Sequence, residues 1–132
     1  MFARGARRAV ESFIDALNAA DWQSAANQLT SEVCFNDCLF ESVRVRSQLL
    51  AFLSGLDDAG LGLQIELRAI SKRGLLVLAR ATMQSNDQRF CGPFQLTFRM
   101  IRDKIHVIDS HRGADAASVV RLYGRQITRQ SV

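Results

Sequence analysis

The sequence predicts a single α+β domain whose helices cover one side of a curved antiparallel sheet and enclose a deep apolar pocket. Hydrophobic residues recur with a helical period in the first part of the chain and with a period of two from residue 63 onward. Short polar turns separate the later segments, and consecutive strands joined in this way pair antiparallel. Helices gathered against an antiparallel sheet define the α+β class.

The composition suits one globular domain over residues 1–132, with 48% hydrophobic and 23% charged residues. The net charge of +4 comes from scattered basic residues without interleaved aromatic residues, so we expect no nucleic-acid partner. No apolar run is long enough to span a bilayer, and the first residues lack the features of a secretory signal. We therefore expect a cytoplasmic protein with no membrane partner.

The three cysteines and two histidines do not have the spacing of a metal site. Cys34, Cys38 and Cys91 are expected to be reduced and mostly buried small hydrophobic residues. We expect no metal, no cofactor and no structural disulfide.

The first part of the chain predicts three helices and one short strand. An apolar stripe predicts a helix over residues 6–20, and Asp21 is a suitable N-cap for a second helix over 22–29. Residues 33–38 are typical of a brief strand. Ser47 can cap a third helix, which ends at a group of glycines.

Four longer strands follow and form an antiparallel meander. They are expected at residues 63–71, 75–84, 90–101 and 105–111. If the sheet bends strongly, its concave face and the first helices enclose a cone, and such an apolar pocket is the default site for a small apolar molecule. Beyond the core of the domain, about residues 6–115, the tail at 116–132 has helical spacing, although Gly124 weakens this interpretation.

Three charged residues are candidates for chemistry in this cone. Arg80 lies in a run that is apolar on both strand faces, and a buried guanidinium requires a carboxylate partner. Asp109 follows Ile105 and Val107 in one strand phase, and Asp37 ends the short early strand. All three are therefore expected to point into the pocket.

Two carboxylates beside one arginine form an acid/base arrangement. The arginine keeps one carboxylate ionised, while desolvation and like-charge repulsion raise the pKa of the other. One carboxyl group can then accept a proton and the other can donate one. The alternative is a buried ion pair that only holds the strands together.

Further side chains are expected to line the cone and contact the ligand. They are Phe13, Trp22, Phe35, Phe52, Leu78, Thr82, Phe94, Leu96 and His111. Aromatic residues such as these are more often core than ligand contacts. His111 shares the strand phase of Asp109 and could line the mouth of the pocket, the alternative being an exposed histidine at the end of its strand.

Several segments resemble the SnoaL-like, nuclear transport factor two-like superfamily. They are FIDALNAADW, the F-N-D strand and CGPFQLTFRMIRDKIHVID, and the resemblance covers about residues 6–115. It implies a cystatin-like roll in which four to six strands wrap around about three helices, and a homodimer formed through the sheet. The superfamily contains ketosteroid isomerases, polyketide cyclases and limonene-1,2-epoxide hydrolases, together with many non-enzymes.

The epoxide hydrolase subgroup is the closer match and implies cofactor-independent opening of an epoxide. Its base aspartate matches Asp109 and its arginine matches Arg80. Phe35, Asp37 and Thr82 stand where that subgroup has a tyrosine, an asparagine and the acid. Asp37 could supply the acid that Thr82 cannot, so the resemblance implies epoxide opening by water or an internal hydroxyl with Asp37, Arg80 and Asp109.

Two alternatives stay open at this point. Aligned with ketosteroid isomerases, Asp37 matches the proton-shuttling base, but Phe13 and Leu96 stand near the positions of the two oxyanion donors. A proton transfer of the isomerase or aldol-cyclase kind would therefore use Asp37 as base. The second alternative is a non-catalytic module that keeps the fold and binds a ligand or a partner.

Overall fold

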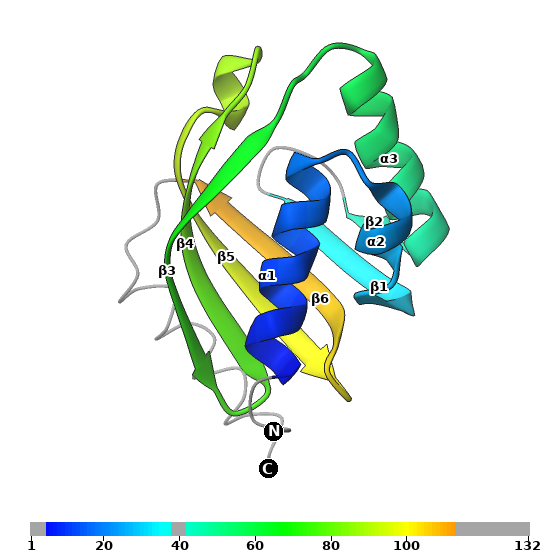
Figure 1. Cartoon of the computed structure of the whole chain (residues 1–132), viewed down its shortest axis with the longest axis vertical. Coiled ribbons are helices and arrows are strands. Elements are labelled where there is room, and N and C mark those ends of the chain that lie inside the picture. The colour runs from blue at the N-terminus through cyan, green and yellow to red at the C-terminus, as the bar shows by residue number, and fades with distance from the viewer. Residues whose placement is uncertain (1–4, 38–41, 113–132) are drawn as a thin grey trace.

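Three α-helices lie on one side of a curved six-stranded sheet in the part of the chain that the structure describes (Figure 1). The computed structural model describes residues 5–36, the backbone of Asp37, and residues 42–112. The helices are α1 (Gly5–Asn18), α2 (Trp22–Ala26) and α3 (Arg46–Asp58), with a short 3-10 helix η2 (Gln88–Phe90). The strands are β1 (Leu29–Asp37), β2 (Val43–Arg44), β3 (Gln64–Arg73), β4 (Leu76–Gln84), β5 (Gly92–Ile101) and β6 (Lys104–Arg112). The predicted α+β class is confirmed.

The sheet has the strand order β2-β1-β6-β5-β4-β3. The four later strands form the predicted antiparallel meander. β1 pairs with β6 in parallel, so the expectation of a purely antiparallel sheet was wrong in this respect. Short turns predict only the pairing of consecutive strands, and β1 and β6 lie far apart in the sequence with no short turn between them.

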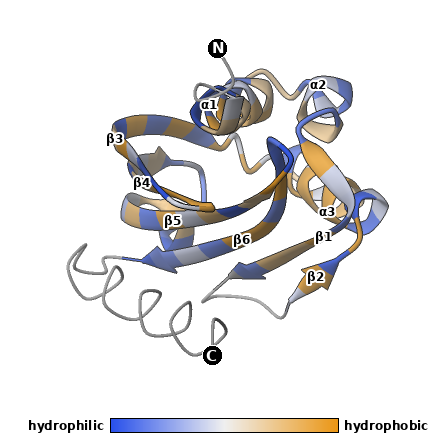
Figure 2. Cartoon of the chain, turned by 90° about the horizontal axis from the view of Figure 1, so that it is seen from below, coloured by the Kyte–Doolittle hydropathy of each residue, from blue (hydrophilic) through white to orange (hydrophobic). Residues whose placement is uncertain are grey.

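α1 covers the concave face of the sheet through its apolar stripe. Val10, Phe13 and Ile14 are buried. α1 contacts β3, β4 and β6, while α3 contacts β1 and β2, and Figure 2 shows these helices on the same side of the sheet. The stripe was predicted from the i, i+3, i+4 spacing. The helices and the sheet therefore enclose one apolar interior.

α2 begins at the N-cap that the sequence predicts. The Asp21 carboxylate accepts hydrogen bonds from the Ser24 hydroxyl at 2.7 Å and from the Ser24 backbone N–H at 3.1 Å. These bonds lower the pKa of Asp21, the hydroxyl contributing most. The helix is shorter than expected, because the chain already enters β1 at Leu29.

α3 does not use Ser47 as its N-cap. The helix begins at Arg46, and its N-cap is Val45, which has a positive φ of 62° and no capping hydrogen bond from its side chain. A β-branched residue rarely adopts this conformation. The strained turn joins the two-residue strand β2, which was not predicted, directly to α3.

Asn18 fixes β3 against the end of α1. Its side-chain amide donates to the Ile65 carbonyl at 2.8 Å, and its side-chain oxygen accepts from the Ile65 N–H at 2.7 Å. The Gln64 side chain also donates to the Asn18 carbonyl at 3.1 Å. The pair of bonds completes the edge of β3 as a neighbouring strand would, and so positions the buried Ile65 side chain.

Two predictions lie outside the described residues. These are the helical tail at 116–132 and the state of Cys38. Cys34 and Cys91 are half-buried free thiols.

Candidate functional site

An apolar pocket lies between α1, α3 and the concave face of the sheet. Its volume open to the centres of water-sized spheres is about 70 Å³, which exceeds the ~10–15 Å³ that one water needs on this measure. The described side chains that line it are Phe13, Ile14, Leu17, Phe35, Leu49, Phe52, Leu53, Leu56, Leu63, Ile65, Met83, Phe90, Leu96, Phe98, Ile108 and Ser110. All but one of these side chains are apolar.

Strand phase decides which side chains of β4 reach this pocket. Val77, Ala79, Ala81 and Met83 are buried in the core, and Met83 lines the pocket. The other phase of the strand faces away from the helices. Because both phases of this strand are apolar in its first half, the sequence could not decide between them.

The prediction that Arg80 points into the pocket was wrong. Arg80 is exposed and lies on the outer face of the sheet, where it lines a separate hollow of about 290 Å³ together with Leu78, Gln95 and Thr97. Thr82 has the same phase, and its hydroxyl accepts a hydrogen bond from the Arg68 side chain at 3.1 Å. Leu78 and Thr82 therefore do not line the apolar pocket, contrary to expectation.

The prediction that Asp109 points into the pocket was also wrong, and a bulge explains why. Arg99 pairs with Val107 but Met100 pairs with Ile105, so one extra residue, His106, interrupts the strand. Ile105 is buried in the core, but two residues farther on the phase has changed. Asp109 therefore lies on the outer face.

The outer face gives Asp109 a structural partner. Its carboxylate accepts a hydrogen bond from the Asn36 side-chain amide at 2.9 Å, and the Asn36 oxygen accepts from the Ser42 hydroxyl at 2.6 Å. His111 has the same phase as Asp109 and pairs in register with Gln95, away from the pocket. Dimerisation through this face stays a prediction.

Ser110 is the residue of β6 that enters the pocket instead of Asp109. It follows Ile108 in the inner phase, and it pairs in register with Leu96 of β5, which also lines the pocket. Among the described lining residues it is the one polar side chain. A serine within a strand carries no sequence signal for a site, and only the bulge at His106 shows which way it faces.

Asp37 is the third predicted charged residue. It is the last residue of β1, and its Cα pairs with Ser110 of β6. Phe35, two residues earlier on the same strand, lines the pocket. The side chain of Asp37 lies outside the part of the chain that the structure describes. Its backbone therefore lies opposite Ser110, the polar residue of the described pocket lining.

Of the remaining predicted lining residues, four line the pocket and two do not. Phe13, Phe35, Phe52 and Leu96 line the pocket as expected. Phe94 is 1% exposed and belongs to the core. Trp22 lies in a neighbouring small hollow, which shares lining side chains of α1 and α3 with the pocket.

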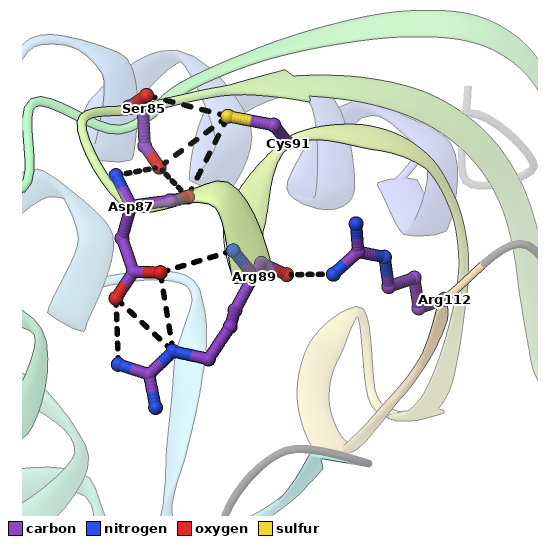
Figure 3. Close-up of polar contacts among 5 residues, drawn as sticks. All are labelled: Ser85, Asp87, Arg89, Cys91 and Arg112. Carbon is purple, nitrogen blue, oxygen red and sulfur yellow. Dashed lines mark hydrogen bonds and ion pairs between the residues drawn. The ribbon is translucent and has the colours of Figure 1, made fainter.

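Polar contacts hold together a compact loop between β4 and β5 (Figure 3). This loop carries Phe90, which lines the pocket. The Ser85 hydroxyl donates to the Asp87 carbonyl at 2.8 Å, and the Cys91 thiol donates to the Ser85 carbonyl at 3.3 Å. Arg112 of β6 donates to the Arg89 carbonyl at 3.0 Å. The loop is thereby tied to its own base and to the end of β6, so that Phe90 stays buried against the pocket.

The ion pair in this loop predicts a titration. The side-chain hydrogen bonds from Arg89, including one of 2.6 Å, and then the backbone N–H of Arg89 lower the pKa of Asp87 from its ordinary value of 3.8 to about 2. Because the folded pKa is the lower one, the contribution of this carboxylate to stability is present above 3.8 and is lost as the pH falls through about 2.

We expect the carboxyl carbon of Asp87 to titrate in an NMR experiment with a midpoint near 2. The Arg89→Gln variant should move this midpoint back toward 3.8, while Arg68→Gln, which changes a distant exposed arginine, should leave it unchanged. The same midpoint in the unaltered protein and in Arg89→Gln would contradict the ion pair.

The described residues contain no group of three or more side chains that could hold a metal ion. No helix among them is long and apolar enough to cross a membrane. The site therefore consists, in the described part of the chain, of an apolar cavity with the Ser110 hydroxyl and the end of β1 at one side.

A comparison with protein-family models found a match that covers most of the chain. Residues 4–112 match the limonene-1,2-epoxide hydrolase catalytic domain. A search of curated proteins gave no match.

Solved structures show the same fold at low sequence identity. An LEH-like epoxide hydrolase from M. tuberculosis is 20% identical, with 80% of each chain covered and a TM-score of 0.68. A proposed polyketide cyclase from Sinorhizobium meliloti is 13% identical, with 79% of this chain and 94% of that chain covered and a TM-score of 0.73. A cystatin-fold protein from Novosphingobium aromaticivorans is 17% identical, covers 80% and 96%, and has a TM-score of 0.68. These likenesses confirm the fold that the resemblance implied.

Proposed function

Because this chain belongs to the limonene-1,2-epoxide hydrolase catalytic-domain family, we propose that it takes an apolar epoxide into the pocket and opens the ring with water. Family membership suggests an epoxide hydrolase-like enzyme, and the pocket supplies the substrate class. The observation that carries the proposal is the cavity, whose described lining is apolar except for one hydroxyl, in a chain that matches this family. Such a lining selects hydrocarbon and excludes charged or strongly hydrated substrates.

We assign proton transfer to Asp37. The support is its register position opposite Ser110, since both Arg80 and Asp109 lie on the outer face. In the proposed step Asp37 accepts a proton from the attacking water as the new C–O bond forms and the ring C–O bond breaks. A second water protonates the opened oxygen, and the hydroxide that it leaves takes the proton from Asp37. The carboxylate and the second water are thereby restored, and the product is a diol.

A substitution that fills the pocket tests whether the pocket is the site of the reaction. We expect Leu53→Phe to lower kcat/KM for styrene oxide at least about tenfold, because the larger side chain occupies ligand space; tenfold corresponds to ~1.4 kcal/mol. Leu50→Phe is the matched control, since Leu50 lies on the same helix and packs against the core without lining the pocket. Diol formation is measured by chromatography.

Equal losses in the two phenylalanine variants would mean that the pocket is not the site. Absence of both diol formation and ligand binding in the unaltered protein would overturn the proposed function itself.

One observation favours a second candidate, a non-catalytic carrier of an apolar molecule. None of the described lining side chains is charged, so the described part of the pocket holds no acid or base. A carrier would bind styrene oxide and release it unchanged. The diol assay above separates the two candidates.

A further inference from the structure

We propose that the Ser110 hydroxyl donates a hydrogen bond to a single oxygen of the ligand, so that the ligand is an apolar molecule with one acceptor oxygen. The inference rests on the proposed function, because it specifies which apolar molecules the same pocket prefers. It adds a specificity determinant that was not among the predicted site residues.

The first support is the state of the hydroxyl. Ser110 is 2% exposed, and its Oγ has no hydrogen-bond partner among the residues that the structure describes. A buried hydroxyl without a partner is costly, because it has lost its hydration without gaining a replacement bond. Such groups are uncommon in folded proteins and require an explanation.

The second support is the direction of the hydroxyl. Ser110 lines the apolar pocket, whereas its neighbours Asp109 and His111 have the opposite strand phase. A ligand oxygen inside the pocket is therefore a partner that this position can reach. Serine can donate its O–H to an acceptor-only oxygen such as that of an epoxide or a ketone.

The apolar remainder of the lining restricts the ligand further. A second polar group on the ligand would meet only hydrocarbon among the described lining residues and would remain without a partner. The pocket should thus bind a mono-oxygenated ligand better than either the parent hydrocarbon or the corresponding diol. The diol product would therefore bind more weakly than the epoxide and would leave the pocket to a new epoxide molecule.

Thr97 provides a matched control for the hydroxyl. It is also 2% exposed, and its Oγ1 also has no partner among the described residues. It lines the hollow on the outer face rather than the apolar pocket. Removal of its hydroxyl therefore tests the loss of an unpartnered buried hydroxyl without touching the ligand site.

The experiment compares acetophenone with ethylbenzene, which share a carbon skeleton and differ by one carbonyl oxygen. Affinities are measured by NMR titration of the unaltered protein, Ser110→Ala and Thr97→Val. We expect Ser110→Ala to weaken acetophenone binding about 5–10-fold, the usual effect of one hydrogen bond, and to change ethylbenzene binding less than about twofold. Thr97→Val should change neither.

The outcomes are separable. If acetophenone and ethylbenzene bind but Ser110→Ala affects both equally or neither, the inference is overturned and the proposed function stands. If neither compound binds the unaltered protein, both are overturned. Without ligand, the thermal midpoint of Ser110→Ala should not fall, because the lost hydroxyl has no partner among the described residues. If the midpoint does fall, Ser110→Cys is used instead, because it keeps the shape of the side chain with a weaker donor. This variant should show the same selective loss of acetophenone affinity.

Discussion

Replacement of Asp37 by asparagine should lower kcat for the opening of styrene oxide at least about 100-fold, the lower range for loss of a general base. Asparagine has nearly the same shape but cannot accept a proton from the attacking water. The Cα of Asp37 pairs in register with that of Ser110, the polar residue of the described pocket lining. Acetophenone affinity, measured by NMR titration, should stay within about twofold, because its carbonyl oxygen is held by Ser110.

Asp109→Asn is the control for this prediction. The substitution is chemically identical but falls on the outer face, where Asp109 accepts a hydrogen bond from Asn36. We expect kcat to change less than about threefold. A large loss in Asp109→Asn with full activity in Asp37→Asn would place the chemistry on the outer face and would refute the assignment of the site.

Truncation of Phe98 to alanine should lower the free energy of unfolding by about 3–5 kcal/mol, the usual cost of a buried Phe→Ala change. Phe98 is 0% exposed, and its ring meets that of Phe13 edge-on with centroids 6.4 Å apart. The contact joins α1 to the sheet at the wall of the pocket. Its loss removes apolar burial and leaves a cavity beside an existing one.

Urea unfolding measures this effect, with Leu75→Ala as control. Leu75 is 68% exposed, so its truncation should cost less than about 0.5 kcal/mol. A cost for Phe98→Ala below about 1 kcal/mol would mean that the core between α1 and the sheet does not have the packing described above.

The secondary structure was predictable because its signals are local. The apolar stripe of α1, the Asp21 cap and the four period-two segments each lie within a few residues of sequence. The parallel pairing of β1 with β6 has no such signal, because it depends on where the chain returns after six intervening elements. The cap at Val45 is likewise set by the turn that leaves β2, not by the preference of its side chain.

The site was only partly predictable because strand phase is not local. In β6 the bulge at His106 reverses the phase, so that Ser110 takes the inward position assigned to Asp109. In β4 both phases are apolar in the first half of the strand, so the sequence does not show which phase faces the helices. A buried ion pair was expected for Arg80 because both faces of the strand were taken to be covered, but Arg80 is exposed and requires no carboxylate partner. The apolar pocket was predicted correctly, but two of its three charged residues were assigned to the wrong face of the sheet.

We expect the ligand to bind between the helices and the concave face of the sheet. Methyl NMR during titration with acetophenone tests it directly, because both faces of the sheet carry methyl groups. We expect shift changes at Ile65, Met83 and Ile108, which line the pocket, and none at Leu78, which lines the outer hollow. Shift changes at Leu78 without changes at Met83 and Ile108 would contradict it.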